Sequence, residues 1–276
     1  TREIVKNAVE SRLLSDVPVG CFLSGGLDSS IVAAIAAKKL PSLDTFTIAF
    51  EDVDDPYHGT ANESEAAAET AAFIGSNHHT IHVKAETFRD SLDDFCKYSD
   101  QPFSVSSGLG ILAVSKKARE LGIKVLLSGD GADETFGGYS WYRYLNDINE
   151  NSYNPSNHIV SFQNVGLTID ERLIAISQMT PKNRALALHY YAHEIEKSNI
   201  FNQDWAYGLS NSNRYFSMLE DRCYPEDYIR HDRNFYFPNE MLRKVDRMTM
   251  ANSVEGRVPF AAPSVLALSD KLKIDH

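Results

Sequence analysis

A short stretch near the start of the chain places glycines, hydroxyls and a carboxylate at the end of an apolar run. Residues 24–30 (Ser-Gly-Gly-Leu-Asp-Ser-Ser) follow residues 17–23, which are predicted to be a buried strand, and precede a helix predicted over 31–40. Such a turn directs backbone N–H groups and the positive end of a helix dipole at an anion, and phosphate is the obvious candidate. Asp28 would repel a bare phosphate, so we expect it to bind a Mg²⁺ that a nucleotide already carries.

This turn differs from the two commoner phosphate loops. It lacks the Gly-Lys-Ser/Thr end of a Walker A loop, and its glycines do not have Gly-x-Gly-x-x-Gly spacing. It resembles the pyrophosphate loop of the N-type ATP pyrophosphatases, which cleave ATP between the α- and β-phosphates. The alternative is a Ser/Gly turn that only joins a strand to a helix.

A second glycine-rich turn repeats the same arrangement. Residues 124–128 are predicted to be another buried strand, and residues 129–134 (Gly-Asp-Gly-Ala-Asp-Glu) follow it directly. Ligands of parallel sheets bind outside the carboxyl ends of the strands, so Asp28 and Asp133 could hold one nucleotide-bound cation from two sides. The alternative for Asp133 is an acidic helix N-terminus that the helix dipole stabilises.

The elements that position these turns alternate along the first half of the chain. Besides the two strands already named, strands are predicted at 45–50 and 79–83, and helices at 2–13, 31–40, 63–74, 86–98 and 110–121. Alternation of this kind over residues 1–145 is typical of βαβ units and predicts an α/β fold, a parallel twisted sheet with flanking helices.

The second half of the chain has a different pattern. Beyond residue 145 the strand pattern disappears, and helices are predicted at 170–179, 181–197 and 239–251. We therefore expect residues 146–276 to form a mainly helical part.

Composition narrows the classes of function. Among 276 residues, 27 Lys and Arg against 38 Asp and Glu give a net charge of −11, which argues against a nucleic-acid backbone as the main partner. The cysteines form no Cys-x-x-Cys pair, which indicates neither a zinc site nor a disulfide framework and favours a reducing cytoplasm. No apolar stretch approaches the roughly 20 residues of a membrane span. His78, His79 and His82 lack partners at ligand spacing, so we interpret them as strand-end histidines rather than metal ligands.

Three motifs in the same order resemble the synthetase domain of glutamine-dependent asparagine synthetases. They are residues 24–30, residues 126–139 (Leu-Leu-Ser-Gly-Asp-Gly-Ala-Asp-Glu-Thr-Phe-Gly-Gly-Tyr) and residues 244–260, and the resemblance runs from about Arg12 to Phe260. It implies the adenine nucleotide alpha-hydrolase-like fold and a carbon–nitrogen ligase that uses ATP, Mg²⁺, aspartate and ammonia. The side-chain carboxylate of aspartate attacks the α-phosphate, pyrophosphate leaves, and ammonia converts β-aspartyl-AMP to asparagine.

The resemblance also implies a role for individual positions. Pyrophosphate would be cradled by Ser24, Gly25, Gly26, Asp28, Ser29 and Ser30. Adenosine would be bordered by Leu23 and Ile48 and contacted by the backbone of Ser128 and Gly129. Mg²⁺ would be bound by Asp28 and Asp133. Asp130 stands where the family carries an acidic residue linked to formation of the intermediate, so it joins these two carboxylates as a catalytic candidate.

Four further charged residues are candidates for positioning the substrate. They are Glu134, Arg247, Glu255 and Arg257. We expect the three in the third motif to form a buried ion-pair network that supports the site, because leaving one such charge unpaired would be costly.

The chain departs from the family in several places. Thr1 cannot be matched to the amino-terminal cysteine nucleophile of the glutaminase, so we expect no glutaminase domain in this chain. The ammonia would then be free or supplied by a partner domain or subunit. Pro259-Phe260 is followed by Ala-Ala, where the family usually has Leu-Asp, and Ser104 replaces an acidic residue. The chain also ends before a lysine that the family places at the phosphates.

Two other functions stay open at this point. An adenylating amide-bond former of the β-lactam synthetase or lasso-peptide cyclase type would keep the nucleotide chemistry and change the acyl substrate. An ATP-binding partner domain without turnover would keep only the nucleotide site. Homo-oligomerisation is open as well.

Overall fold

The structure is a computed structural model that describes residues 1–51, 63–101, 107–139, 142 and 224–272. The chain forms two compact units, one made of residues 1–136 with 233–272 and the other of residues 137–232 with 273–276. From the sequence we expected an α/β part to end at residue 145 and a mainly helical part to follow it. In the structure, residues 233–272 belong to the same unit as the amino-terminal residues. Helices predicted at 170–179 and 181–197 lie outside the described residues. The first unit contains every candidate site residue and is described below.

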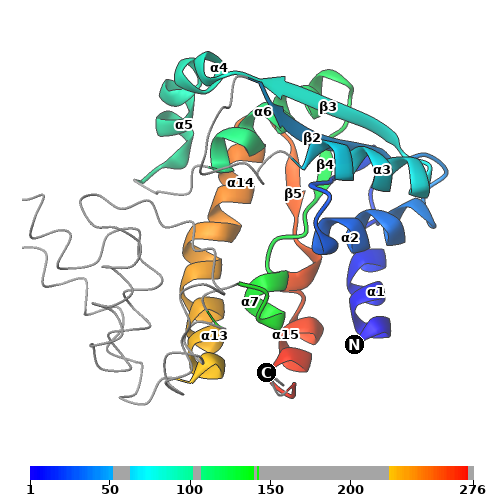
Figure 1. Cartoon of the computed structure of the whole chain (residues 1–276), viewed down its shortest axis with the longest axis vertical. Helices are drawn as coiled ribbons and strands as arrows, with labels where there is room; N and C mark the ends of the chain where they lie inside the picture. The colour runs from blue at the N-terminus through cyan, green and yellow to red at the C-terminus, as the bar shows by residue number, and fades with distance from the viewer. Residues whose placement is uncertain (52–62, 102–106, 140–141, 143–223, 273–276) are drawn as a thin grey trace, which may run out of the picture. The chain divides into compact units, whose positions relative to one another are not determined.

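A sheet of five parallel strands forms the centre of this unit, in the order β3-β2-β1-β4-β5 (Figure 1). The strands are β1 (Val19–Phe22), β2 (Asp44–Phe50), β3 (Asn77–Val83), β4 (Val125–Leu127) and β5 (Glu255–Arg257). All four pairings are parallel, which confirms the predicted parallel sheet with flanking helices. Since β2 and β4 lie on opposite sides of β1, the chain reverses its direction of travel across the sheet there, and parallel sheets bind ligands at such a point.

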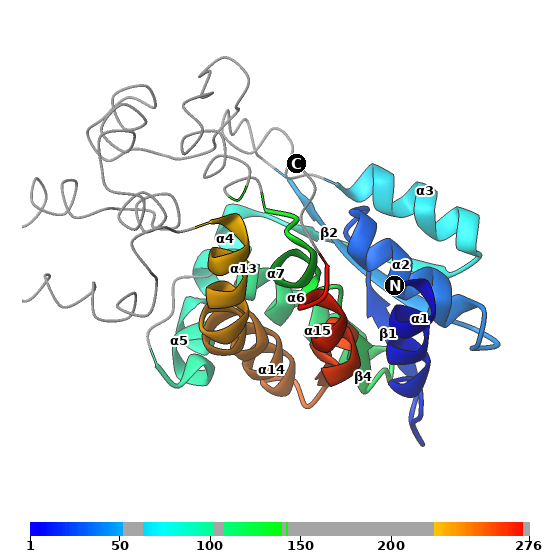
Figure 2. The same ribbon diagram turned by 90° about the horizontal axis from the view of Figure 1, so that it is seen from below.

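One face of the sheet is covered by α1 (Arg2–Ser11), α2 (Leu27–Ala37), α3 (Ser64–Ile74) and α15 (Pro263–Ser269), next to the short α7 (Ala132–Phe136) (Figure 2). Their shared core includes the alanines at 33, 36, 67 and 71, all buried. Side chains this small let α2 and α3 pack closely against each other over β1 and β2.

The other face is covered by α4 (Ala85–Asp90), α5 (Leu92–Ser99), α6 (Ser107–Glu120) and α14 (Leu242–Met250). A buried hydrogen bond of 3.0 Å from the Ser115 hydroxyl to the Met248 carbonyl joins α6 to α14. Leu126 packs into this core while Leu127 packs into the opposite one, so β4 is buried on both faces. The continuous apolar run of β4 follows from that burial.

Several elements differ from the sequence prediction, and three of the differences have a clear local cause. Helix α2 begins at Leu27 instead of 31, with Gly26 as an extended N-cap, so Asp28 lies in its first turn. The helix predicted over 86–98 is broken at Ser91, whose hydroxyl donates to the Thr87 carbonyl at 2.7 Å. Strand β5 was not predicted, because three residues with a central glycine and charged ends carry no apolar alternation.

The remaining described elements precede or follow α14 and β5 along the chain. They are α13 (Pro225–Asn234), the π-helix η3 (Phe237–Met241) and the 3₁₀-helix η4 (Pro259–Ala261). Among the described residues, no helix is long and apolar enough to cross a membrane.

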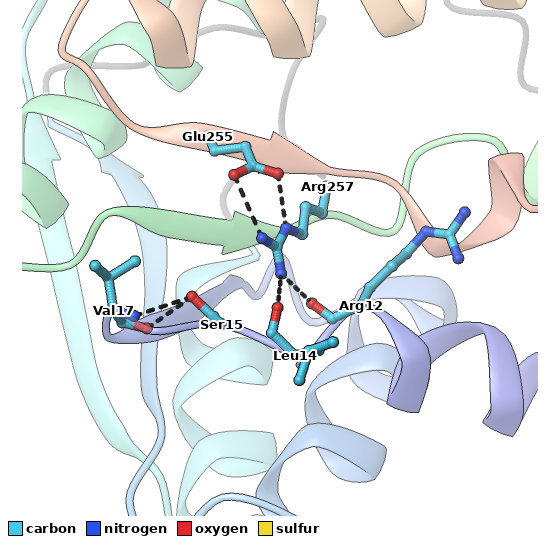
Figure 3. A network of polar contacts seen from close by, with 6 residues as sticks. All are labelled: Arg12, Leu14, Ser15, Val17, Glu255 and Arg257. Atoms are coloured by element: carbon cyan, nitrogen blue, oxygen red, sulfur yellow. Dashed lines mark hydrogen bonds and ion pairs between the residues drawn. The ribbon is translucent and has the colours of Figure 1, made fainter.

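The edge strand β5 is held to the segment between α1 and β1 by one side chain (Figure 3). Arg257 donates from Nη1 to the carbonyls of Arg12 at 2.7 Å and Leu14 at 2.8 Å. Its Nε and Nη2 atoms donate to the two carboxylate oxygens of Glu255 at 2.8 and 3.3 Å. This hydrogen bonding lowers the pKa of the Glu255 carboxyl. Arg257 therefore joins two segments that lie at opposite ends of the sequence.

We predict that Arg257→Met lowers the free energy of unfolding by about 2 kcal/mol, since two backbone carbonyls lose a charged donor. Glu255→Gln should cost less than about 1 kcal/mol, because the Glu255 side chain is mostly exposed. Urea unfolding of the two variants measures the difference. Equal losses would show that the Glu255 pair, and not the carbonyl contacts, supplies the stabilisation.

Candidate functional site

A cavity of about 820 Å³ lies at the carboxyl ends of β1, β2 and β4. Most of the predicted site residues line it, namely Leu23, Ser24, Asp28, Ser29, Ile48, Ser128, Gly129, Asp130 and Asp133. One part of the wall is apolar and contains Phe46, Phe50, Val83, Phe88 and Val114. The two glycine-rich turns thus meet at one cavity, as their position after parallel strands predicts.

Hydroxyl groups hold the first turn in shape. The Ser24 and Ser29 hydroxyls lie 3.0 Å apart, and the Ser24 N–H donates to Ser29 Oγ at 3.1 Å. Ser30 donates from Oγ to the Gly26 carbonyl at 2.7 Å and does not line the cavity. Ser24 and Ser29 therefore face the cavity, whereas Ser30 stabilises the start of α2.

Two glycines are required because protein atoms approach them closely. Gly25 has φ +82°, and a Cβ there would lie 2.8 Å from Ala66 Cβ. A Cβ on Gly129 would lie 2.7 Å from the Ser29 backbone nitrogen. Gly25 therefore lets the first turn pack against α3, and Gly129 lets the second turn pack directly against the first turn of α2.

We predict that Gly25→Ala is more destabilising than Gly75→Ala. Both glycines have positive φ, so both substitutions carry about 1 kcal/mol of backbone strain. The Gly75 position has open space around it, whereas a methyl group at position 25 would collide with α3. Thermal unfolding should show an additional cost of about 1–3 kcal/mol at Gly25, and similar losses would contradict the close packing described here.

Three carboxylates influence one another at the polar end of the cavity. Burial first, and then the charges of Asp28 and Asp130, raise the pKa of Asp133 to about 6. Burial and the charge of Asp130 also raise the pKa of Asp28. A cation placed here would relieve this repulsion.

The donor set fits a Mg²⁺ that arrives with a nucleotide. Asp28 and Asp133 supply carboxylate oxygens, which this ion prefers. Within the described ranges, no group of three acidic, histidine or cysteine side chains is arranged to hold an ion alone. Mg²⁺ is commonly held by one or two carboxylates together with substrate phosphates, which is what this pair offers.

Asp130 differs from the other two carboxylates because it has an opposite charge beside it. Lys244 on α14 donates from Nζ to Asp130 Oδ1 at 2.7 Å, and the Ser128 hydroxyl donates to Oδ2. The Asp130 N–H donates in turn to Ser128 Oγ at 3.2 Å. The Lys244 side chain is only 5% exposed and also lines the cavity.

We predict that Asp133→Asn stabilises the metal-free protein at neutral pH. The folded-state pKa of about 6 lies above the ordinary 3.8, so the folded state keeps a proton that the unfolded chain releases as pH rises. The stability of the parent protein should therefore decline between those two values. The substitution should add about 1–2 kcal/mol at pH 7, less than the whole pKa difference gives because the carboxyl is partly exposed.

Urea unfolding in EDTA at pH 4 and pH 7 measures this effect. The gain from Asp133→Asn should be present at pH 7 and absent at pH 4. A gain of equal size at both pH values would mean that ionisation of Asp133 is not its source.

The structure places the remaining predicted site residues outside the cavity wall. Gly25 and Gly26 belong to the first turn, and Glu134 is fully buried on α7. Arg247 donates to Asp100 Oδ2 at 2.9 Å, away from the Glu255–Arg257 pair. The expectation of one buried network formed by the charged trio is therefore wrong, because Arg247 has a different partner and both pairs are partly exposed.

Sequence reasoning did not single out Lys244. A signal was present, since α14 buries Lys244, Val245, Met248 and Thr249, which lie on one helical face. A lysine on the buried face of an amphipathic helix is rarely found without a charged partner. The pattern could have indicated a buried acidic residue, but the identity of that residue depends on the tertiary fold.

The fold and the site together define a parallel α/β domain with two glycine-rich turns at the point where the strand order reverses. The family model described as asparagine synthase matches residues 1–275, and the chain belongs to that family.

Curated relatives match almost the whole chain. A Mycobacterium tuberculosis protein is 32% identical over 98% of this chain and 41% of its own length. Asparagine synthetase [glutamine-hydrolyzing] 1 of Bacillus subtilis is 30% identical over 98% of this chain and 43% of its own length. This chain thus spans less than half the length of either relative. Among solved structures, an NH3-dependent NAD synthetase from Campylobacter jejuni matches with a TM-score of 0.33 and 17% identity, covering 79% of this chain and 95% of that one.

Proposed function

We propose that this chain is the synthetase part of an asparagine-forming ligase. It would use ATP to activate the side-chain carboxylate of aspartate and transfer the acyl group to ammonia, with AMP and pyrophosphate as the other products. The observation that carries the proposal is the meeting of two glycine-rich turns and three carboxylates at one cavity, in a chain of the asparagine synthase family.

The cavity walls suggest where each part of the nucleotide binds. We propose that adenosine lies against Leu23 and Ile48, with the backbone of Ser128 and Gly129 beside it, because this part of the wall is mainly apolar. The pyrophosphate portion would lie at residues 24–30, where the N-terminus of α2 and the serine hydroxyls offer donors. Their proximity in one cavity supports this assignment.

Activation places heavy electrostatic demands on the site. A carboxylate must approach a polyphosphate, and negative charge then shifts onto the leaving pyrophosphate. Mg²⁺ held by Asp28 and Asp133 would neutralise part of that charge. The donors of the first turn would hold the leaving group, and Asp130, fixed by Lys244 and Ser128, would order the surroundings of the reacting carboxylate.

The proposed reaction has two steps, and atoms and charge balance in each. The aspartate carboxylate oxygen forms a bond to the α-phosphorus as the bond to the bridging oxygen breaks, which releases pyrophosphate. Ammonia then attacks the acyl carbon, AMP leaves with the electrons of the acyl–oxygen bond, and one proton is lost from nitrogen. We propose that the ammonia is either free or delivered by a glutaminase domain or subunit. We also propose a cytoplasmic location for the protein.

The experiment is a pyrophosphate-release assay with MgATP, aspartate and ammonium. The protein should form AMP, pyrophosphate and asparagine in equal amounts. Asp28→Asn and Asp133→Asn should each lower kcat at least about 100-fold, since each removes a proposed Mg²⁺ ligand. Asp90→Asn, on the exposed surface of α4, is the matched control and should keep full activity.

Two results would redirect the assignment. Pyrophosphate release with another carboxylic acid but not with aspartate would favour an adenylating amide-bond former with a different acyl substrate. MgATP binding without turnover for any acid would favour a nucleotide-binding partner domain.

A further inference from the structure

We propose that Lys244 is a positioning residue for this reaction, one that fixes Asp130 and cancels its charge so that the other two carboxylates remain available to the cation. The inference rests on the proposed function, because it concerns the same site.

The geometry makes Asp130 the charged partner of Lys244 within the described residues. Nζ lies 2.7 Å from Asp130 Oδ1, and its other hydrogen bond is a weak one of 3.8 Å to Met241 Sδ. Both oxygens of Asp130 are used, since Oδ2 accepts from the Ser128 hydroxyl. The carboxylate is therefore held from two sides and cannot rotate freely toward a cation.

The pair connects two motifs that are far apart in the chain. Lys244 lies on α14, whereas Asp130 lies in the turn between β4 and α7, 114 residues earlier. Gly131 in the same turn has φ +91°, and a Cβ there would lie 2.5 Å from a ring atom of Phe237 in η3. The segment that carries η3 and α14 thus sets the position of the second turn through one charged contact and one steric contact.

Stability alone does not account for a buried ion pair here. Burying an ammonium costs desolvation energy, and well-packed apolar residues in place of a buried pair usually stabilise a protein as well or better. Lys244 nevertheless extends to the cavity wall beside three carboxylates. A functional demand for positive charge explains that placement.

The charges around the two turns indicate why a positive charge is needed at position 244. On the part of the wall formed by the two turns and α14, three ionised carboxylates at positions 28, 130 and 133 and one ammonium at position 244 sum to −3 + 1 = −2, which equals the charge of one divalent cation in magnitude. Without the ammonium the sum is −3, and the excess charge would face an incoming substrate carboxylate. The other lysine in the described lining, Lys84, is 55% exposed and lies beside Glu51, so it cannot replace Lys244.

The test is a double-mutant cycle in the natural protein that contains this chain. Lys244→Met keeps the length of the side chain and removes its charge. It should lower kcat for aspartate-dependent pyrophosphate release about 100-fold and change KM for ATP less than about 10-fold. In an Asp130→Asn background, the same substitution should lower kcat less than about 3-fold, because the charge that Lys244 compensates is gone.

Two further variants separate positioning from folding. Lys244→Arg keeps the charge and should retain kcat within about 10-fold of the parent. Arg243→Met removes the neighbouring positive charge on α14. Because Arg243 bonds to Asp100 and not to Asp130, this variant should keep parental activity. If Lys244→Met does not fold, the double variant with Asp130→Asn should fold again, since it no longer buries an unpaired carboxylate.

The results that overturn the inference are distinct from those that overturn the proposed function. Equal losses from Lys244→Met in both backgrounds, or parental kcat in Lys244→Met alone, would exclude coupling to Asp130. If the parent protein shows no aspartate-dependent release, the proposed function is wrong. The cycle is then measured on MgATP affinity by calorimetry, where absence of coupling between the two positions overturns the inference by itself.

Discussion

The site depends on the close approach of two turns that follow adjacent parallel strands. Because β1 pairs with β4, the turns after them leave the same edge of the sheet, and Gly129 then packs against the backbone of Ser29. No side chain fits between them. This contact fixes the distance between the first glycine-rich turn and the carboxylates of the second turn, so the sheet register largely sets the geometry of the cavity.

The central part of the fold could be predicted from local pattern. Short apolar runs gave four of the five strands, two of them ending at a glycine-rich turn, and the glycine at 75 marked the end of α3. Asp28 and Asp133 were predicted to share one site because strand ends of a parallel sheet share an edge, and both line the cavity. These inferences succeed because each depends on few residues and on a strong geometric rule.

The third motif was harder to interpret because its role is tertiary. Strand β5 pairs through its backbone and needs no apolar alternation, so its three residues resemble a loop in the sequence. Charge spacing cannot reveal that Arg247 bonds to Asp100 while Arg257 bonds to Glu255 and two carbonyls. Nor can it show that Lys244 bonds to Asp130, since that pair forms only when α14 packs beside the second turn.

The position of β5 in the sequence has a consequence for how the protein folds. It pairs with β4 although more than a hundred residues separate them, and Arg257 reaches a carbonyl 245 residues earlier in the chain. Contacts of such long range carry a large loop-closure cost and form slowly. During synthesis, therefore, strands β1 to β4 can assemble first, and the wall that carries Lys244 is added only after the ribosome has delivered the last part of this sequence.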